Sequence, residues 1–243
     1  MTDILVFGAH PDDAEFGMGA TIVKLVSERK SVAICVLTRG ECGTFGTPEK
    51  REVEAQEAAK MAGTEIVLLD FKDCQIFDNF ESRLKVAEVI RKFRPKIIFA
   101  PYHTNPANHR DGMAHPDHTA LGTIVRHSAR YAKFKNLKEL SGEPWDAEEI
   151  IYYMLPKVKK PNCIVDVSEY SEKWEEVAKC HQSQLKLKDG NIINHIKAQK
   201  ENTGKLIGVK FAEGFFVEGT EKFDISYTLN KSKDLKSSLP YSI

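Results

Sequence analysis

Short apolar runs alternate with longer amphipathic stretches through the first hundred residues. Runs that are apolar at successive positions are typical of strands buried between two helix layers, and they occur at residues 4–7, 32–37, 66–69 and 97–100. Between them, apolar positions recur at helical spacing over residues 15–29, 49–62 and 81–93. This alternation predicts an α/β fold, a Rossmann-like, doubly wound, mostly parallel sheet with helices on both faces.

The pattern is less regular in the second half of the chain. Helical spacing predicts helices over residues 118–133, 169–181 and 191–206, and extended segments are expected at 149–155, 162–167 and 209–217. With 243 residues and 42% hydrophobic content, the chain can build one large core. We expect a single domain over residues 1–228 and a disordered tail over 229–243, where Lys and Ser are frequent and apolar residues are scarce.

Composition narrows the choice of partner and compartment. Lys+Arg and Asp+Glu both number 35, so the net charge is zero, which argues against nucleic acid or an anionic membrane as partner. The five cysteines are odd in number and include no C-x-x-C pair, so a disulfide framework is not expected. Neither a signal-peptide pattern nor an apolar run of about 20 residues is visible. A cytoplasmic protein with a small-molecule substrate is therefore predicted.

The candidate chemistry follows the strands. His10, Asp12 and Asp13 come directly after the first predicted strand, and His115 and His118 lie in a loop after the fourth. Ligand sites in such sheets lie beyond the carboxyl ends of the strands, so these loops are expected to converge. His10, Asp13 and His118 would give a His-Asp-His ligand set, which suits zinc, while iron and manganese remain open.

Two side chains are left over from this ligand set. A bound metal lowers the pKa of water, and Asp12 could accept the proton that such water releases. His115 could stabilise an oxyanion or protonate a leaving group. The simpler alternatives are that Asp12 or Asp13 caps the next helix and that each His is a polar surface residue. Two His-Asp motifs at the ends of parallel strands favour the metal site.

A glycine-rich loop, residues 39–47, follows the second predicted strand. Arg51 lies on the helix after it and could bind a substrate hydroxyl, carboxylate or phosphate with two donors. The alternative is a solvent-exposed helix with ordinary charge pairs. Gly17-Met18-Gly19 suggests dinucleotide binding only weakly, because G-x-G-x-x-G is not completed.

Two further features lie outside these motifs. The polar connection over residues 102–114 is long, as in loops that serve as lids. Glu213 stands between apolar residues, so it needs a partner if it is buried.

Together the motifs resemble those of the PIG-L/LmbE-like N-deacetylase family. The matching motifs are Ala-His-Pro-Asp-Asp at residues 9–13, Gly-Glu-x-Gly-Thr at 40–44, Arg-x-x-Glu at 51–54 and His-Pro-Asp-His at 115–118. The resemblance covers roughly residues 3–220 and implies a zinc-dependent hydrolase that removes acetyl from N-acetylglucosamine-type sugars, an amidohydrolase acting on linear amides.

The resemblance also implies roles for individual residues. His10, Asp13 and His118 match the zinc ligands, Asp12 the general base, and His115 the group that stabilises the oxyanion or acts as acid. Asp117 would orient His115 or the neighbouring ligand. Arg51 matches a substrate-contacting arginine.

Segments 161–168 and 211–216 look most like the bacillithiol-biosynthesis branch of the family. That branch implies N-acetylglucosaminyl-malate as substrate and a homo-oligomer such as a hexamer. The alternatives are a deacetylase of another N-acetylated amino sugar and a non-catalytic metal- or nucleotide-binding Rossmann-like protein. A hydrolase of phosphate esters would favour two metals and more carboxylates.

Overall fold

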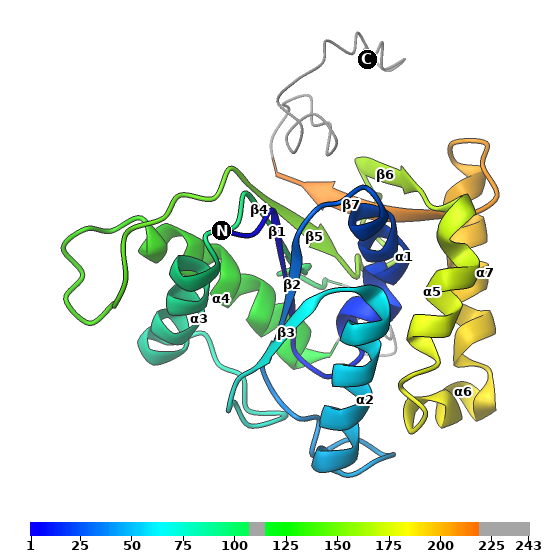
Figure 1. The fold of residues 1–243 in the computed structure, drawn as a ribbon, viewed down its shortest axis with the longest axis horizontal. Helices are drawn as coiled ribbons and strands as arrows, with labels where there is room; N and C mark the ends of the chain where they lie inside the picture. Colours follow the sequence, from blue (N-terminus) through cyan, green and yellow to red (C-terminus); the bar gives the residue numbers. More distant parts are fainter. Residues whose placement is uncertain (107–114, 219–243) are drawn as a thin grey trace, which may run out of the picture.

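Within residues 1–106 and 115–218, which the computed structural model describes, seven strands form a sheet in the order β3-β2-β1-β4-β5-β7-β6 (Figure 1). The strands from β1 to β5 pair in parallel, and β7 runs antiparallel to both β5 and β6. Their bounds are β1 Ile4–Gly8, β2 Val32–Val36, β3 Glu65–Leu68, β4 Ile97–Pro101, β5 Glu149–Tyr153, β6 Cys163–Asp166 and β7 Ala212–Val217. The predicted mostly parallel α/β sheet is confirmed.

Helices cover both faces of this sheet (Figure 1). On one face lie α1 (Asp13–Ser27), α2 (Pro48–Ala62), α5 (Ser171–Ala178) and α7 (Ile192–Lys205). On the other lie α3 (Phe80–Phe93) and α4 (Pro116–Ala132). Short elements complete the second half of the chain: η1 (Ser168–Tyr170), η2 (Gln184–Lys186) and α6 (Leu187–Gly190).

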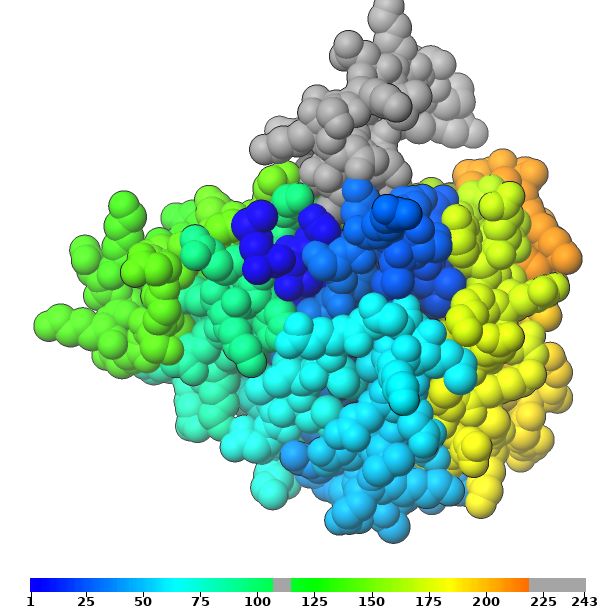
Figure 2. Space-filling model, in the orientation of Figure 1, coloured from blue at the N-terminus to red at the C-terminus, as the bar shows by residue number. Residues whose placement is uncertain are grey.

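The core follows from the alternation of side chains along the strands. In β1, Ile4 and Val6 pack under α1, whereas Leu5 and Phe7 pack under α3 and α4, and all four are fully buried. In the space-filling view, the cyan surface of α2 adjoins the yellow surface of α5, so the second half of the chain extends the layer begun by the first (Figure 2).

Two predicted elements differ from the structure by three residues at one end, and the others by fewer. The strand expected over residues 209–217 begins only at Ala212, because the Val209 N–H donates to the Gly204 carbonyl in the turn that ends α7. The helix expected over residues 169–181 reaches only from Ser171 to Ala178 and is preceded by η1.

The tail expected over residues 229–243, and residues 107–114 of the long connection, lie outside the described residues. Among the described residues, no helix has the length and apolar character that a membrane span requires.

Helix α1 is interrupted at Met18, whose backbone leaves the helical region. The carboxylate of Glu213, on β7, accepts hydrogen bonds from the freed N–H groups of Ala20 (3.2 Å) and Thr21 (2.7 Å). Lys200 of α7 also donates to this carboxylate, and both side chains are buried. The partner that a buried Glu213 was predicted to need is therefore present.

Replacing Glu213 by Ala should lower the free energy of unfolding by about 3–5 kcal/mol, because it leaves Lys200 buried without its counter-charge. Denaturant unfolding followed by circular dichroism measures this loss. Glu201→Ala, on the exposed side of α7, is the matched control and should stay within about 0.5 kcal/mol of the wild type. A loss below about 1 kcal/mol for Glu213→Ala would show that the pair does not support the helix break.

Candidate metal centre

The loops after β1, β2, β3 and β4 meet at the carboxyl edge of the sheet. There His10 lies within ion-pair distance of Asp13 and Asp73, and Asp13 lies within ion-pair distance of His118. The loops after β1 and β4 thus converge as predicted, and the loops after β2 and β3 join them through Asp73, which accepts a hydrogen bond from the Cys42 N–H and lies 3.0 Å from His10 Nε2. The side chains of His10, Asp13, Asp73 and His118 are all buried.

Asp13 holds the turn after β1 in place. One of its carboxylate oxygens, Oδ2, accepts hydrogen bonds from the N–H groups of Ala9 (2.8 Å) and His10 (2.9 Å). The same oxygen lies 3.6 Å from His10 Nδ1, and Oδ1 lies 3.1 Å from His118 Nε2. Burial raises the pKa of Asp13, but His118 and His10 outweigh it and hold that pKa well below its usual value. The carboxylate is thus ionised and faces both predicted histidine ligands.

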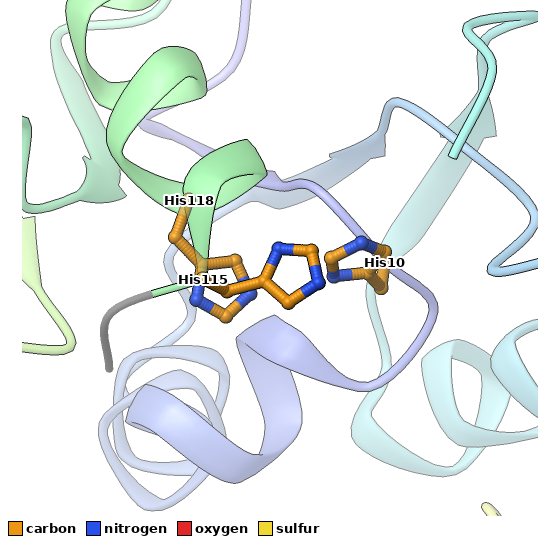
Figure 3. A group of neighbouring side chains, drawn as sticks. All are labelled: His10, His115 and His118. Atoms are coloured by element: carbon orange, nitrogen blue, oxygen red, sulfur yellow. The ribbon is translucent and has the colours of Figure 1, made fainter. Parts of the chain in front are cut away.

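The three histidines form one group, in which His10 reaches towards His115 and His118 from the loop after β1 (Figure 3). A ring nitrogen from each lies within 4.8 Å of the other two. Within the described part of the chain, Nδ1 of buried His118 has no hydrogen-bond partner, and its Nε2 is shared only with the Asp13 carboxylate, 3.1 Å away. Buried nitrogens without partners are costly, so this group fits a metal ion. His115, predicted to handle protons, is also close enough to ligate.

Asp12 stands in an unusual backbone conformation, with φ 138° and ψ −21°. A non-glycine residue is strained there, and such strain is concentrated at functional sites. Within the described residues, the side chain makes no capping hydrogen bond to α1. Burial raises the pKa of Asp12 to about 6, although Arg51 acts to lower it. The capping alternative is wrong for Asp12, and also for Asp13, whose hydrogen bonds run back to the preceding turn.

Arg51 lies inside the protein and supports this turn. Its guanidinium donates to Asp12 Oδ2 (3.2 Å), to the Pro11 carbonyl (3.0 Å) and to the Gly40 carbonyl (3.0 Å). The alternative of a solvent-exposed charge is wrong, since only 4% of the residue is exposed. Gly40 has φ 66°, and a Cβ there would overlap the guanidinium. The contact of Arg51 with a substrate remains a prediction.

Three carboxylates surround His10. Its Nε2 lies 3.0 Å from Asp73 Oδ1 and 3.6 Å from Asp117 Oδ2, while Asp13 faces its other nitrogen. Burial lowers the pKa of His10, but Asp117, Asp13 and Asp73 together raise it to about 12. A metal must therefore displace a proton from this ring. The carboxylate of Asp117 thus approaches the predicted ligand His10, whereas its role of orienting His115 or the neighbouring ligand remains a prediction.

His115 presents its second nitrogen to the group. Its Nδ1 accepts the Asp117 N–H at 3.2 Å, so the neutral ring carries its proton on Nε2. Burial, with the neighbouring His10 and His118, lowers the pKa of His115. The ring is thus held neutral as a hydrogen-bond donor.

Sequence reasoning missed several residues that build this site. Asp73 follows β3, and the rule that placed the other loops at the sheet edge would have placed it there too. From the second half, Ser183 donates through its N–H (2.8 Å) and Oγ (2.6 Å) to Glu54 of α2, the glutamate of the Arg-x-x-Glu motif. Buried His181 has its Nε2 3.4 Å from Glu15 Oε2. No periodicity marks these contacts, because they join distant segments.

Comparison with known proteins places the chain among deacetylases. The family model described as "PIG-L: GlcNAc-PI de-N-acetylase" matches residues 5–129. Diacetylchitobiose deacetylase of Thermococcus kodakarensis is 30% identical over 89% of this chain and 83% of its own length. A 1D-myo-inositol 2-acetamido-2-deoxy-alpha-D-glucopyranoside deacetylase of Rhodococcus erythropolis is 25% identical over 70% of this chain and 67% of its own.

The crystal structure of the conserved protein TT1542 from Thermus thermophilus superposes with a TM-score of 0.82 at 33% identity. The superposition covers 92% of this chain and 98% of the TT1542 chain. The chain belongs to the PIG-L family of metal-dependent deacetylases. The two named deacetylases support that family and give no support to its bacillithiol branch.

His118→Ala should weaken metal retention by at least about tenfold, since even supporting contacts to metal ligands are worth that much. Elemental analysis of zinc-loaded protein after dialysis measures the retained metal. His195→Ala, on an exposed position of α7, is the matched control and should retain metal as the wild type does. Full occupancy in His118→Ala would contradict its role as a ligand.

Proposed function

We propose that this protein is a zinc-dependent hydrolase that removes the acetyl group from an N-acetylglucosamine conjugate. The reaction consumes water and splits the acetamide C–N bond, giving acetate and a free amine. The observation that carries the proposal is Asp12, a buried carboxylate with a strained backbone beside the predicted ligands. Its side chain makes no capping hydrogen bond to α1 and is held by Arg51 instead.

His10, Asp13 and His118 are the proposed metal ligands. Zinc bound there would act as a Lewis acid and supply an activated nucleophile at neutral pH. The protein's own part begins with Asp12, which accepts the proton of the attacking water. A carboxylate with a pKa of about 6 is suited to this step, because it is largely ionised at neutral pH and still basic enough to take the proton.

His115 completes the proposed proton and charge handling. Its neutral ring holds a proton on Nε2, which can donate a hydrogen bond to the oxygen that becomes negative as the carbonyl is attacked. The proton taken by Asp12, or that of His115, then passes to the departing amine. Arg51 positions Asp12, since its guanidinium binds both the carboxylate and the carbonyl of the preceding residue.

The substrate class rests on the relatives. Those described above are named for diacetylchitobiose and for an inositol glycoside of 2-acetamido-2-deoxyglucose, which share an N-acetylglucosamine unit. The malate conjugate of the bacillithiol branch is the finer proposal, based on segments 161–168 and 211–216. The inositol glycoside and diacetylchitobiose are the alternative substrates.

Zinc-loaded protein should release free amine from one or more members of a panel of N-acetylglucosaminides with malate, inositol or N-acetylglucosamine aglycones. Fluorescent labelling of primary amines measures the rate. Asp12→Asn should retain its metal and lose about 10²–10⁴ in kcat/KM, the usual contribution of a general base.

Two outcomes would contradict the proposal. Release of no amine from the whole panel would favour a metal-binding protein without this activity. Asp12→Asn at the wild-type rate would remove Asp12 from the reaction. His195→Ala is the control for handling and metal content.

The acid limb of the pH profile tests the pairing of Arg51 with Asp12. The charge of Arg51 lowers the pKa of Asp12, so Arg51→Met should let Asp12 keep its proton to higher pH. The acid limb of the plot of kcat/KM against pH should then shift to higher pH. Arg51→Lys keeps the charge and should move it less. If the Arg51→Met protein has unchanged metal content and its acid limb stays in place or shifts to lower pH, Arg51 does not set this pKa.

A further inference from the structure

Two cysteines from different loops meet beside the proposed centre. Cys42 lies in the loop after β2 and Cys74 in the loop after β3, and both are exposed. Their sulfur atoms and a carboxylate oxygen of Asp73 all lie within 4.8 Å of one another. Neither thiol has a part in the proposed reaction, so the cluster calls for a separate explanation.

Hydrogen bonds hold the loops that carry these groups. The Cys42 N–H donates to Asp73 Oδ2 (2.9 Å), and the Asp73 N–H donates to Glu41 Oε1 (2.9 Å). The Cys74 N–H donates to Asp117 Oδ2 (2.8 Å). Asp73 and Asp117, two of the buried carboxylates that surround His10, therefore hold the backbone on which the two thiols stand.

The donor set has a definite chemical preference. Thiolate ligands select zinc, cadmium and other soft cations, and zinc accepts mixed sulfur and oxygen ligands with one position left for water. The oxygen Oδ2 of Asp73 already accepts one N–H, but each carboxylate oxygen offers two lone pairs. A cation would also offset the negative charge that two thiolates add beside Asp73 and Glu41.

We propose that Cys42, Asp73 and Cys74 form a second metal site for a soft divalent cation, and that its occupation inhibits the enzyme. The inhibition follows from Asp73, whose Oδ1 lies 3.0 Å from His10 Nε2. A cation drawn to the thiols competes for this carboxylate and weakens the support of a proposed zinc ligand. The inhibitory part rests on the proposed deacetylase activity, whereas the binding part does not.

Cadmium titration of the full, zinc-loaded chain tests the binding. Under a phosphine reductant, the wild type should show a thiolate-to-cadmium charge-transfer absorption that saturates at one additional cation per chain. Cys42→Ser and Cys74→Ser should each weaken this binding by at least about tenfold, and the double variant should abolish the band. Cys163→Ser, in β6, should behave as the wild type. An equal band in the double variant, or no band in the reduced wild type, would overturn the site.

The inhibition is measured separately, as amine release with increasing cadmium or excess zinc. Activity should fall in the wild type and in Cys163→Ser as the band saturates, and it should persist in the double variant. Equal inhibition of the wild type and the double variant would overturn the link through Asp73. If no chain releases amine while the band behaves as expected, the proposed function fails and the metal site stands.

Discussion

The rest of the site depends on the hydrogen bonds between the Asp13 carboxylate and the backbone of the turn after β1. This carboxylate fixes the turn by accepting two backbone N–H groups, and it also faces His10 and His118. Backbone hydrogen bonds fix this carboxylate, so His10 in the turn after β1 and His118 in the first turn of α4 both face a carboxylate that is already in place. The tight turn leaves Asp12 in its strained conformation, where its side chain is directed to Arg51 and away from the helix it precedes.

This constraint concentrates buried charge at one edge of the sheet. Asp12, Asp13, Asp73 and Asp117 are all buried there, and burying a charge is costly unless it is paired. Arg51 compensates Asp12, whereas the other three carboxylates surround His10. That arrangement keeps a proton on His10 in the absence of metal, and a divalent cation can replace that proton while compensating more of the acidic charge.

Much of this architecture could be predicted from the sequence, because the relevant signal is local. Buried strands are visible as apolar runs, and the rule for parallel sheets then brings His10 and His118 to one edge although they are far apart in the chain. Arg51 was harder to place. Its helix is rich in charged residues and resembles an exposed helix, and only the structure shows that the guanidinium reaches back to the turn after β1. Contacts such as Glu54 with Ser183 join segments whose pairing no periodicity encodes.

The break in α1 explains how fold and site can be held by different parts of the chain. The first turn of α1 begins at Asp13, whose position is set by the sheet edge, while the helix beyond Met18 is held by Glu213 from β7. An unbroken helix would transmit any adjustment of its packed end to Asp13 and the other proposed metal ligands, because its backbone is rigid. With the break, Glu213 and Lys200 stabilise the packed end, and the first turn takes its direction from Asp13. The strained geometry at Asp12 can therefore persist without distorting the core against which α1 is packed.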